Sequence, residues 1–133
     1  MEIEIKIKIS RDVIEDIFVT AIEGGSNYWY FLSDKAIRKI RNAVPEDVDP
    51  YLSTAIVKAI LDHNVEVDIC DLEDDDEGDV IGTISLSTMS ERLNLLSASD
   101  NRDALFNFIN ETADAGDADI VFQYLAMGEV VYG

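Results

Sequence analysis

The sequence predicts an α+β domain, in which a small antiparallel sheet of about three strands is covered on one face by several helices. Alternating apolar and polar residues near the start of the chain and over residues 65–86 are typical of strands with one buried face. Most other segments repeat apolar residues at helical spacing between capping residues and glycines. Because 133 residues with 47% hydrophobic content suffice for one core, we expect a single globular domain over 1–133.

Three segments carry the strand pattern. Residues 2–9 alternate isoleucine with glutamate or lysine, which predicts a strand with one wet face. The alternating segments within 65–86 flank a short polar loop and predict a β-hairpin. Alternation places Val80 and Leu86 on its inner face and Cys70 on its outer face.

Helix boundaries follow from capping residues, prolines and glycines. The first helix is expected to start at Ser10 and end at Gly24-Gly25, the second to start at Ser33 or Asp34, and the third to run from Asp49-Pro50 to His63-Asn64. Further helices are expected to start at Ser87 or Thr88 and at Ser99-Asp100, with a break at Ala115-Gly116. Asp117 is expected to cap the last helix, which ends at Gly128.

The charge of the chain is −18 and is concentrated in its C-terminal half. Residues 1–58 hold eight basic and ten acidic residues, whereas residues 59–133 hold two basic and eighteen acidic ones. Such a field repels nucleic acid and anionic membranes and attracts basic proteins and cations. We therefore expect no direct nucleic-acid binding and no membrane association. The basic helix over 35–41 makes self-association through the acidic half an alternative.

The acidic hairpin loop is the most conspicuous candidate site. Its carboxylates are Glu73, Asp74, Asp75, Asp76, Glu77 and Asp79. A calcium loop centred on Gly78 would place Ile84 at the closing bidentate position, where no ligand atom is available. The remaining interpretations are a surface for a basic partner and a solvated loop.

Other chemistry finds little support in the sequence. His63 and Cys70 are the only residues of their types, and no third group is evident to orient either for catalysis or metal binding. Asp68 and Asp71 are the best candidates for a divalent-metal enzyme, although no metal motif surrounds them. No glycine-rich phosphate loop is present. We predict no catalytic residues, no metal and no cofactor.

An aromatic cluster, Tyr28 to Phe31, contains the only tryptophan, Trp29. We favour a core role, in which Trp29 fills a gap between the first helix and the sheet with its N–H bonded, over an exposed binding surface.

Two segments resemble a family of small acidic phage and prophage proteins: Glu23-Gly24-Gly25-Ser26-Asn27-Tyr28-Trp29, and the C-terminal stretch from Asp117 that ends Gly128-Glu129-Val130-Val131-Tyr132-Gly133. The family has no assigned activity, so the resemblance implies a phage or prophage origin and action in a bacterial cytoplasm, but no catalytic residues. If the shared residues are structural, Gly24 and Gly25 end a helix and Trp29 docks near Tyr132.

The function predicted from these observations is a non-enzymatic accessory protein that binds a basic host or phage protein through its acidic C-terminal half, in one form as a nucleic-acid mimic. Mimicry requires carboxylates arrayed on one face at phosphate-like spacing. The alternatives are a small divalent-metal-dependent enzyme and a self-associating structural protein of a virus particle.

Overall fold

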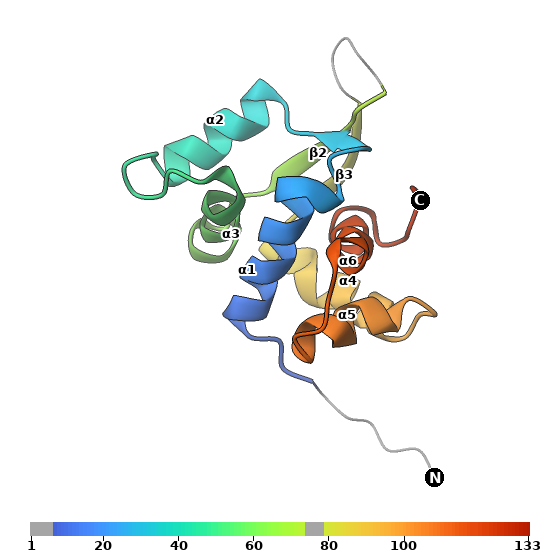
Figure 1. The fold of residues 1–133 in the computed structure, drawn as a ribbon. Coiled ribbons are helices and arrows are strands. Elements are labelled where there is room, and N and C mark those ends of the chain that lie inside the picture. The colour runs from blue at the N-terminus through green and yellow to red at the C-terminus, as the bar shows by residue number, and fades with distance from the viewer. Residues whose placement is uncertain (1–6, 74–78) are drawn as a thin grey trace.

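The computed structural model of the protein describes residues 7–73 and 79–133 (Figure 1). Over these ranges the chain is an α+β fold with a three-stranded antiparallel sheet, as predicted. Its elements are α1 (Arg11–Thr20), a π-helical turn η1 (Ala21–Gly25), β1 (Tyr30–Phe31), α2 (Asp34–Ala43), α3 (Leu52–His63), β2 (Val67–Asp71), β3 (Val80–Ile84), α4 (Leu86–Ser97), α5 (Arg102–Ile109) and α6 (Ala115–Met127). None of the helices in the described ranges is long and apolar enough to cross a bilayer.

The sheet has the order β1-β2-β3, and the predicted hairpin is its β2–β3 pair. The expected strand over 2–9 is wrong in its described part, because residues 7–9 are not in a strand; residues 1–6 lie outside the described ranges. The free edge of β2 is taken instead by Tyr30 and Phe31, which pair with Asp71 and Cys70. Ile9 packs against the core as part of the extended lead-in to α1.

Val80, Cys70 and Leu86 depart from the predicted alternation, and a β-bulge explains the position of Val80. Ile69 pairs with Gly82 but Cys70 pairs with Val80, so Ile81 is an extra residue and Val80 turns outward, where it is 56% exposed. Cys70 is buried, because α2 packs against β2 and the backbone of Ser33 lies within hydrogen-bond reach of its thiol. Leu86 is exposed and begins α4, since the strand ends at Ile84.

Side-chain capping explains the starts of α1 and α2. Helices α4 and α5 begin at Leu86 and Arg102 without a side-chain cap, and not at the predicted Ser87 or Thr88 and Ser99-Asp100. Ser10 and Ser33 accept hydrogen bonds from Val13 N and Ala36 N, which confirms both predicted starts. α3 begins two residues after Pro50, because the carboxylate of Asp49 bonds to Tyr51 N and pairs with Lys58.

The N-terminus of α6 also differs from the prediction. Asp114 and Asp117 form a capping box, in which each side chain accepts a hydrogen bond from the other's backbone N–H. Ala115-Gly116 is therefore the first turn of α6 and not a break. The helix ends as predicted at Gly128, whose φ of +78° is the left-handed conformation that favours glycine.

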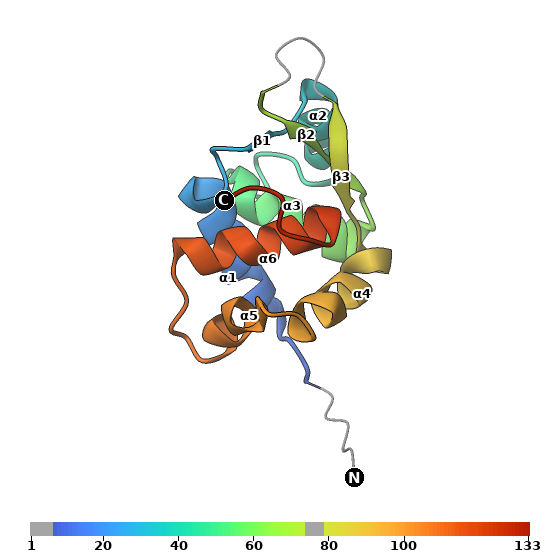
Figure 2. The same cartoon turned by 90° about the vertical axis from the view of Figure 1, so that its right-hand side faces the viewer.

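The core lies where α1 packs against α3 and α6, and where α6 packs against β3. Its largest fully buried side chains include Phe18 of α1, Ile60 of α3, Ile69 of β2 and Phe122 of α6. Figure 2 shows α6 crossing the molecule, with the β2–β3 hairpin on one side of it and α4 and α5 on the other. After Gly128 the C-terminal tail turns back along α6 toward β1 (Figure 2).

Candidate functional site

The acidic hairpin loop is only partly described by the structure. Glu73 and Asp79 lie at its two ends and are exposed, while residues 74–78 lie outside the described ranges. The loop is anchored by Asp71, whose backbone N–H donates to Asp79 O and whose carboxylate accepts from Glu73 N. Glu73 and Asp79 are therefore held at the loop end of the β2–β3 hairpin.

A second group of carboxylates lies on the helices at the other end of the molecule (Figures 1 and 2). It is formed by exposed side chains of α4, α5 and the connections around α5. Its members are Glu91, Asp100, Asp103 and Glu111, and we call them the helical acidic group. No hydrogen bond or ion pair of these four side chains occurs within the described part of the chain.

The two arginines of the C-terminal half do not neutralise these acids. Arg92 donates to Tyr124 O at 3.5 Å, and Arg102 donates to Ser99 O at 3.1 Å. Both guanidinium groups thus bond to backbone carbonyls. Among the described residues, the ion pairs instead involve cations of the N-terminal half, Arg11 and Lys58.

Helix α2 carries a compensating positive charge, but it lies near the hairpin. Lys35, Arg38, Lys39 and Arg41 belong to α2, which packs against β2. Lys39 donates to the backbone of Glu66 in the segment before β2 at 2.9 Å. Lys39 therefore joins α2 to the start of β2, whereas the acidic loop follows the end of that strand.

The most elaborate polar cluster is buried around Asp119 of α6, which is 8% exposed. Its Oδ1 accepts hydrogen bonds from Ser26 Oγ and Trp29 Nε1, both at 2.8 Å. Its Oδ2 accepts from the Tyr28 hydroxyl and from Gln123 Nε2. Within the described ranges no lysine or arginine pairs with Asp119, so four neutral donors stabilise its charge. We call these five residues the Asp119 cluster.

Gln123 extends the Asp119 cluster to the C-terminal tail. Its Oε1 accepts from the backbone N–H groups of Val131 and Tyr132, and its Nε2 also donates to Tyr132 O. The Tyr132 ring stacks on Trp29 with centroids 5.1 Å apart and an interplanar angle of 12°. The predicted docking of Trp29 near Tyr132 is therefore present, and the two segments of the phage resemblance touch each other.

The glycines of the first segment have different surroundings. A Cβ on Gly25 would lie 2.8 Å from Ala115 O, so the close approach of α6 requires a glycine there. A Cβ on Gly24 would meet nothing within 4 Å. The helix ends after these residues as predicted, although its last turn widens into the π-helical η1.

Two tyrosines of the aromatic cluster, Tyr28 and Tyr30, have raised pKa values. Partial burial, and then the hydrogen bond to Asp119, raise the pKa of Tyr28 to about 12. Burial alone raises the pKa of Tyr30 to about 12. Both hydroxyls thus hold their protons at neutral pH, and Tyr28 serves as a hydrogen-bond donor to the carboxylate.

The other candidate residues do not come together as a reactive site. Asp68 accepts a hydrogen bond from Thr83, and no group of three His, Cys, Asp or Glu residues in the described ranges is placed to hold a metal ion. Burial, followed by the charges of Asp68 and Asp79, raises the pKa of the Cys70 thiol. His63 is exposed at the end of α3.

Sequence reasoning did not single out Asp119 or Gln123. The available signal was the pair of polar residues at a helical spacing of four on an otherwise apolar helix. The Asp119 cluster joins the connection between η1 and β1 to α6, and Gln123 joins it to the tail. Every buried side-chain polar atom of the described residues has a hydrogen-bond partner. Its geometry is that of a structural cluster, and the acidic surface is the candidate for binding.

Comparison with protein-family models, with curated proteins and with solved structures gave no match. The resemblance to small phage proteins stays a prediction from the two segments.

Proposed function

We propose that this chain is a non-enzymatic binding protein that acts in a bacterial cytoplasm, as a phage or prophage accessory protein, on a basic protein partner. The supporting observation is the unneutralised charge of residues 59–133. Their two arginines bond to backbone carbonyls, and the helical acidic group is exposed without ion pairs in the described part of the chain. Such a surface attracts a basic protein over a distance of about one Debye length, near 8 Å at physiological salt.

The positions of the two groups of acids indicate what kind of partner surface fits them. The loop end of the β2–β3 hairpin, with Glu73 and Asp79, and the helical acidic group lie at opposite ends of the fold (Figures 1 and 2). Two separated groups suit a partner with an extended basic surface better than one with a single small basic pocket. A nucleic-acid-binding protein has such a surface, because it must neutralise phosphates along its ligand. Nucleic-acid mimicry is the narrower form of the proposal, and it requires in addition that the two groups of carboxylates share one face of the molecule.

Two variants with the same change in charge test the proposal and locate the surface. The helical variant carries Glu91→Gln, Asp100→Asn, Asp103→Asn and Glu111→Gln. The hairpin variant carries the corresponding amide substitutions at residues 74–77. The native protein and both variants are used as baits for bacterial lysate at low salt. Any captured basic protein is then purified. The Kd of its complex with the native protein and with each variant is measured at several salt concentrations, and double-stranded DNA is added as a competitor.

We expect the native bait to bind a basic protein with a Kd that weakens steeply with salt, and the helical variant to bind it more weakly than the hairpin variant does. Displacement of the partner by DNA supports mimicry, whereas binding that DNA leaves unchanged supports a basic partner of another kind. Equal binding by all three baits would refute the acidic surface as the binding site. Capture of no protein by the native bait would refute the proposal itself.

A further inference from the structure

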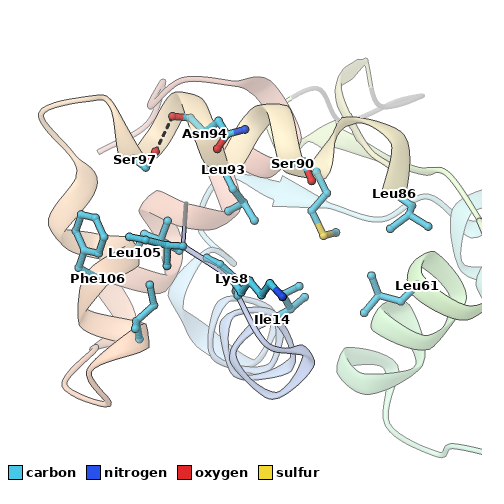
Figure 3. A pocket seen from close by; sticks show the side chains of 14 residues that line it. Lys8, Ile14, Leu61, Leu86, Ser90, Leu93, Asn94, Ser97, Leu105 and Phe106 are labelled. Atoms are coloured by element: carbon cyan, nitrogen blue, oxygen red, sulfur yellow. Dashed lines mark hydrogen bonds between the residues drawn. The ribbon is translucent and has the colours of Figure 1, made fainter. Parts of the chain in front are cut away.

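A groove at the end of the molecule where the chain enters α1 has no acidic residue among the described residues that line it, although the chain has 28 acidic residues. It encloses about 730 Å³, within the usual range for sites that hold small organic ligands. Fourteen residues line it, and they come from the lead-in to α1, from α1 itself, and from α3, α4 and α5 (Figure 3). The groove belongs to neither the Asp119 cluster nor the acidic surface.

The walls of the groove are mainly apolar. Figure 3 shows Leu86 and Leu93 of α4 on one side, Phe106 of α5 at one end and Leu61 of α3 at the other. Leu86 is 44% exposed, and Ile7 of the lead-in, which also lines the groove, is 51% exposed. Apolar side chains that stay exposed around a hollow mark a surface that gains by being covered.

Of the residues in 7–73 and 79–133 that line the groove, Lys8 is the only charged one. Its side chain lies in the groove next to Ile14, below α4 (Figure 3). Within the described ranges its ammonium group has no hydrogen bond and no ion pair. Ser90, Asn94 and Ser97 add polar groups along the α4 wall.

We infer that this groove binds a single-chain amphiphile with an anionic head, of the class of free long-chain carboxylates. The apolar walls would cover the hydrocarbon chain, and the Lys8 ammonium would meet the carboxylate. Charge complementarity selects this occupant, because a cationic head would face Lys8 with no acidic residue in the described part of the lining. The net charge of the protein disfavours a flat anionic membrane, whereas one carboxylate beside Lys8 lies within the local field of the lysine.

Calorimetric titration of the full chain with decanoate, dodecanoate and tetradecanoate below their micellar concentrations tests this inference. Each buried methylene contributes about 0.8 kcal/mol, so we expect affinity to rise roughly threefold to fourfold per methylene until the groove is filled. Dodecanol should bind up to about fivefold more weakly than dodecanoate, since partly exposed ion pairs are worth up to about 1 kcal/mol. Dodecyltrimethylammonium should bind weakest.

Two variants tie the binding to the groove. Lys8→Gln should remove the preference for dodecanoate over dodecanol, whereas the control Lys35→Gln, on exposed α2, should keep it. Ser90→Phe places a ring in the groove from an exposed position and should abolish binding while the circular dichroism spectrum stays native. The inference is overturned if dodecanoate gives no binding heat, if the cationic amphiphile binds tighter, if only anionic phospholipid vesicles bind, or if either groove variant binds like the native chain.

Discussion

Replacing Asp119 by alanine tests the central structural role of the Asp119 cluster. The substitution removes the acceptor of two fully buried donors, Ser26 Oγ and Trp29 Nε1, whose residues are 0% and 2% exposed. Each buried donor left unsatisfied costs about 1–3 kcal/mol. Tyr28 can bond to water because it is 52% exposed, and Gln123 keeps its bond to Tyr132 O.

The expected loss for Asp119→Ala is therefore about 2–6 kcal/mol of the free energy of unfolding, from two orphaned donors. That is a large share of the about 5–15 kcal/mol typical of a domain. Asp119→Asn retains one carbonyl oxygen as an acceptor, so we expect a loss of about half that size. The matched control is Glu91→Gln, which removes one exposed carboxylate without a described partner and should stay within about 0.5 kcal/mol of the native protein.

Urea unfolding measures these differences. The fluorescence of Trp29, the only tryptophan, reports on the Asp119 cluster itself, and circular dichroism reports on the helices. Coincident transitions justify a two-state free energy. If Asp119→Ala unfolds within about 0.5 kcal/mol of the native protein, the cluster does not stabilise the fold and the reasoning is wrong.

Two further predictions concern the glycines and tyrosines of residues 24–30. Gly25→Ala should cost about 1–3 kcal/mol, because its Cβ would lie 2.8 Å from Ala115 O, whereas Gly24→Ala should be nearly neutral; equal melting of the two variants would contradict this. The tyrosine shifts predict a pH dependence. Folding raises the pKa of Tyr28 and Tyr30 from 10.0 to about 12, so this stabilisation is complete below pH 10 and is lost as the pH rises toward about 12. Urea unfolding at successive pH values should show the fall, and Tyr28→Phe should reduce it; a flat profile would exclude the effect.

Local signals in the sequence were sufficient for most of the fold. The alternation over residues 65–86 predicted the hairpin, and Ser10, Ser33 and Gly128 marked helix ends correctly, because capping depends on groups within one turn of the chain. The charge division was likewise a property of composition alone. Local reasoning could not assign the third strand, because either residues 2–9 or the aromatic cluster could pair with the edge of β2.

For the candidate sites too, some properties depend on composition and others depend on the tertiary structure. The sequence alone determined that the C-terminal half carries a charge of −16 and that the hairpin loop is acidic. Only the tertiary structure decided that Arg92 and Arg102 leave those acids unneutralised, and that Lys8 meets apolar residues of α4 and α5 in one groove. The Asp119 cluster likewise joins residues about ninety positions apart. Contacts at that separation depend on how helices pack, and packing leaves no periodic signal in a single sequence.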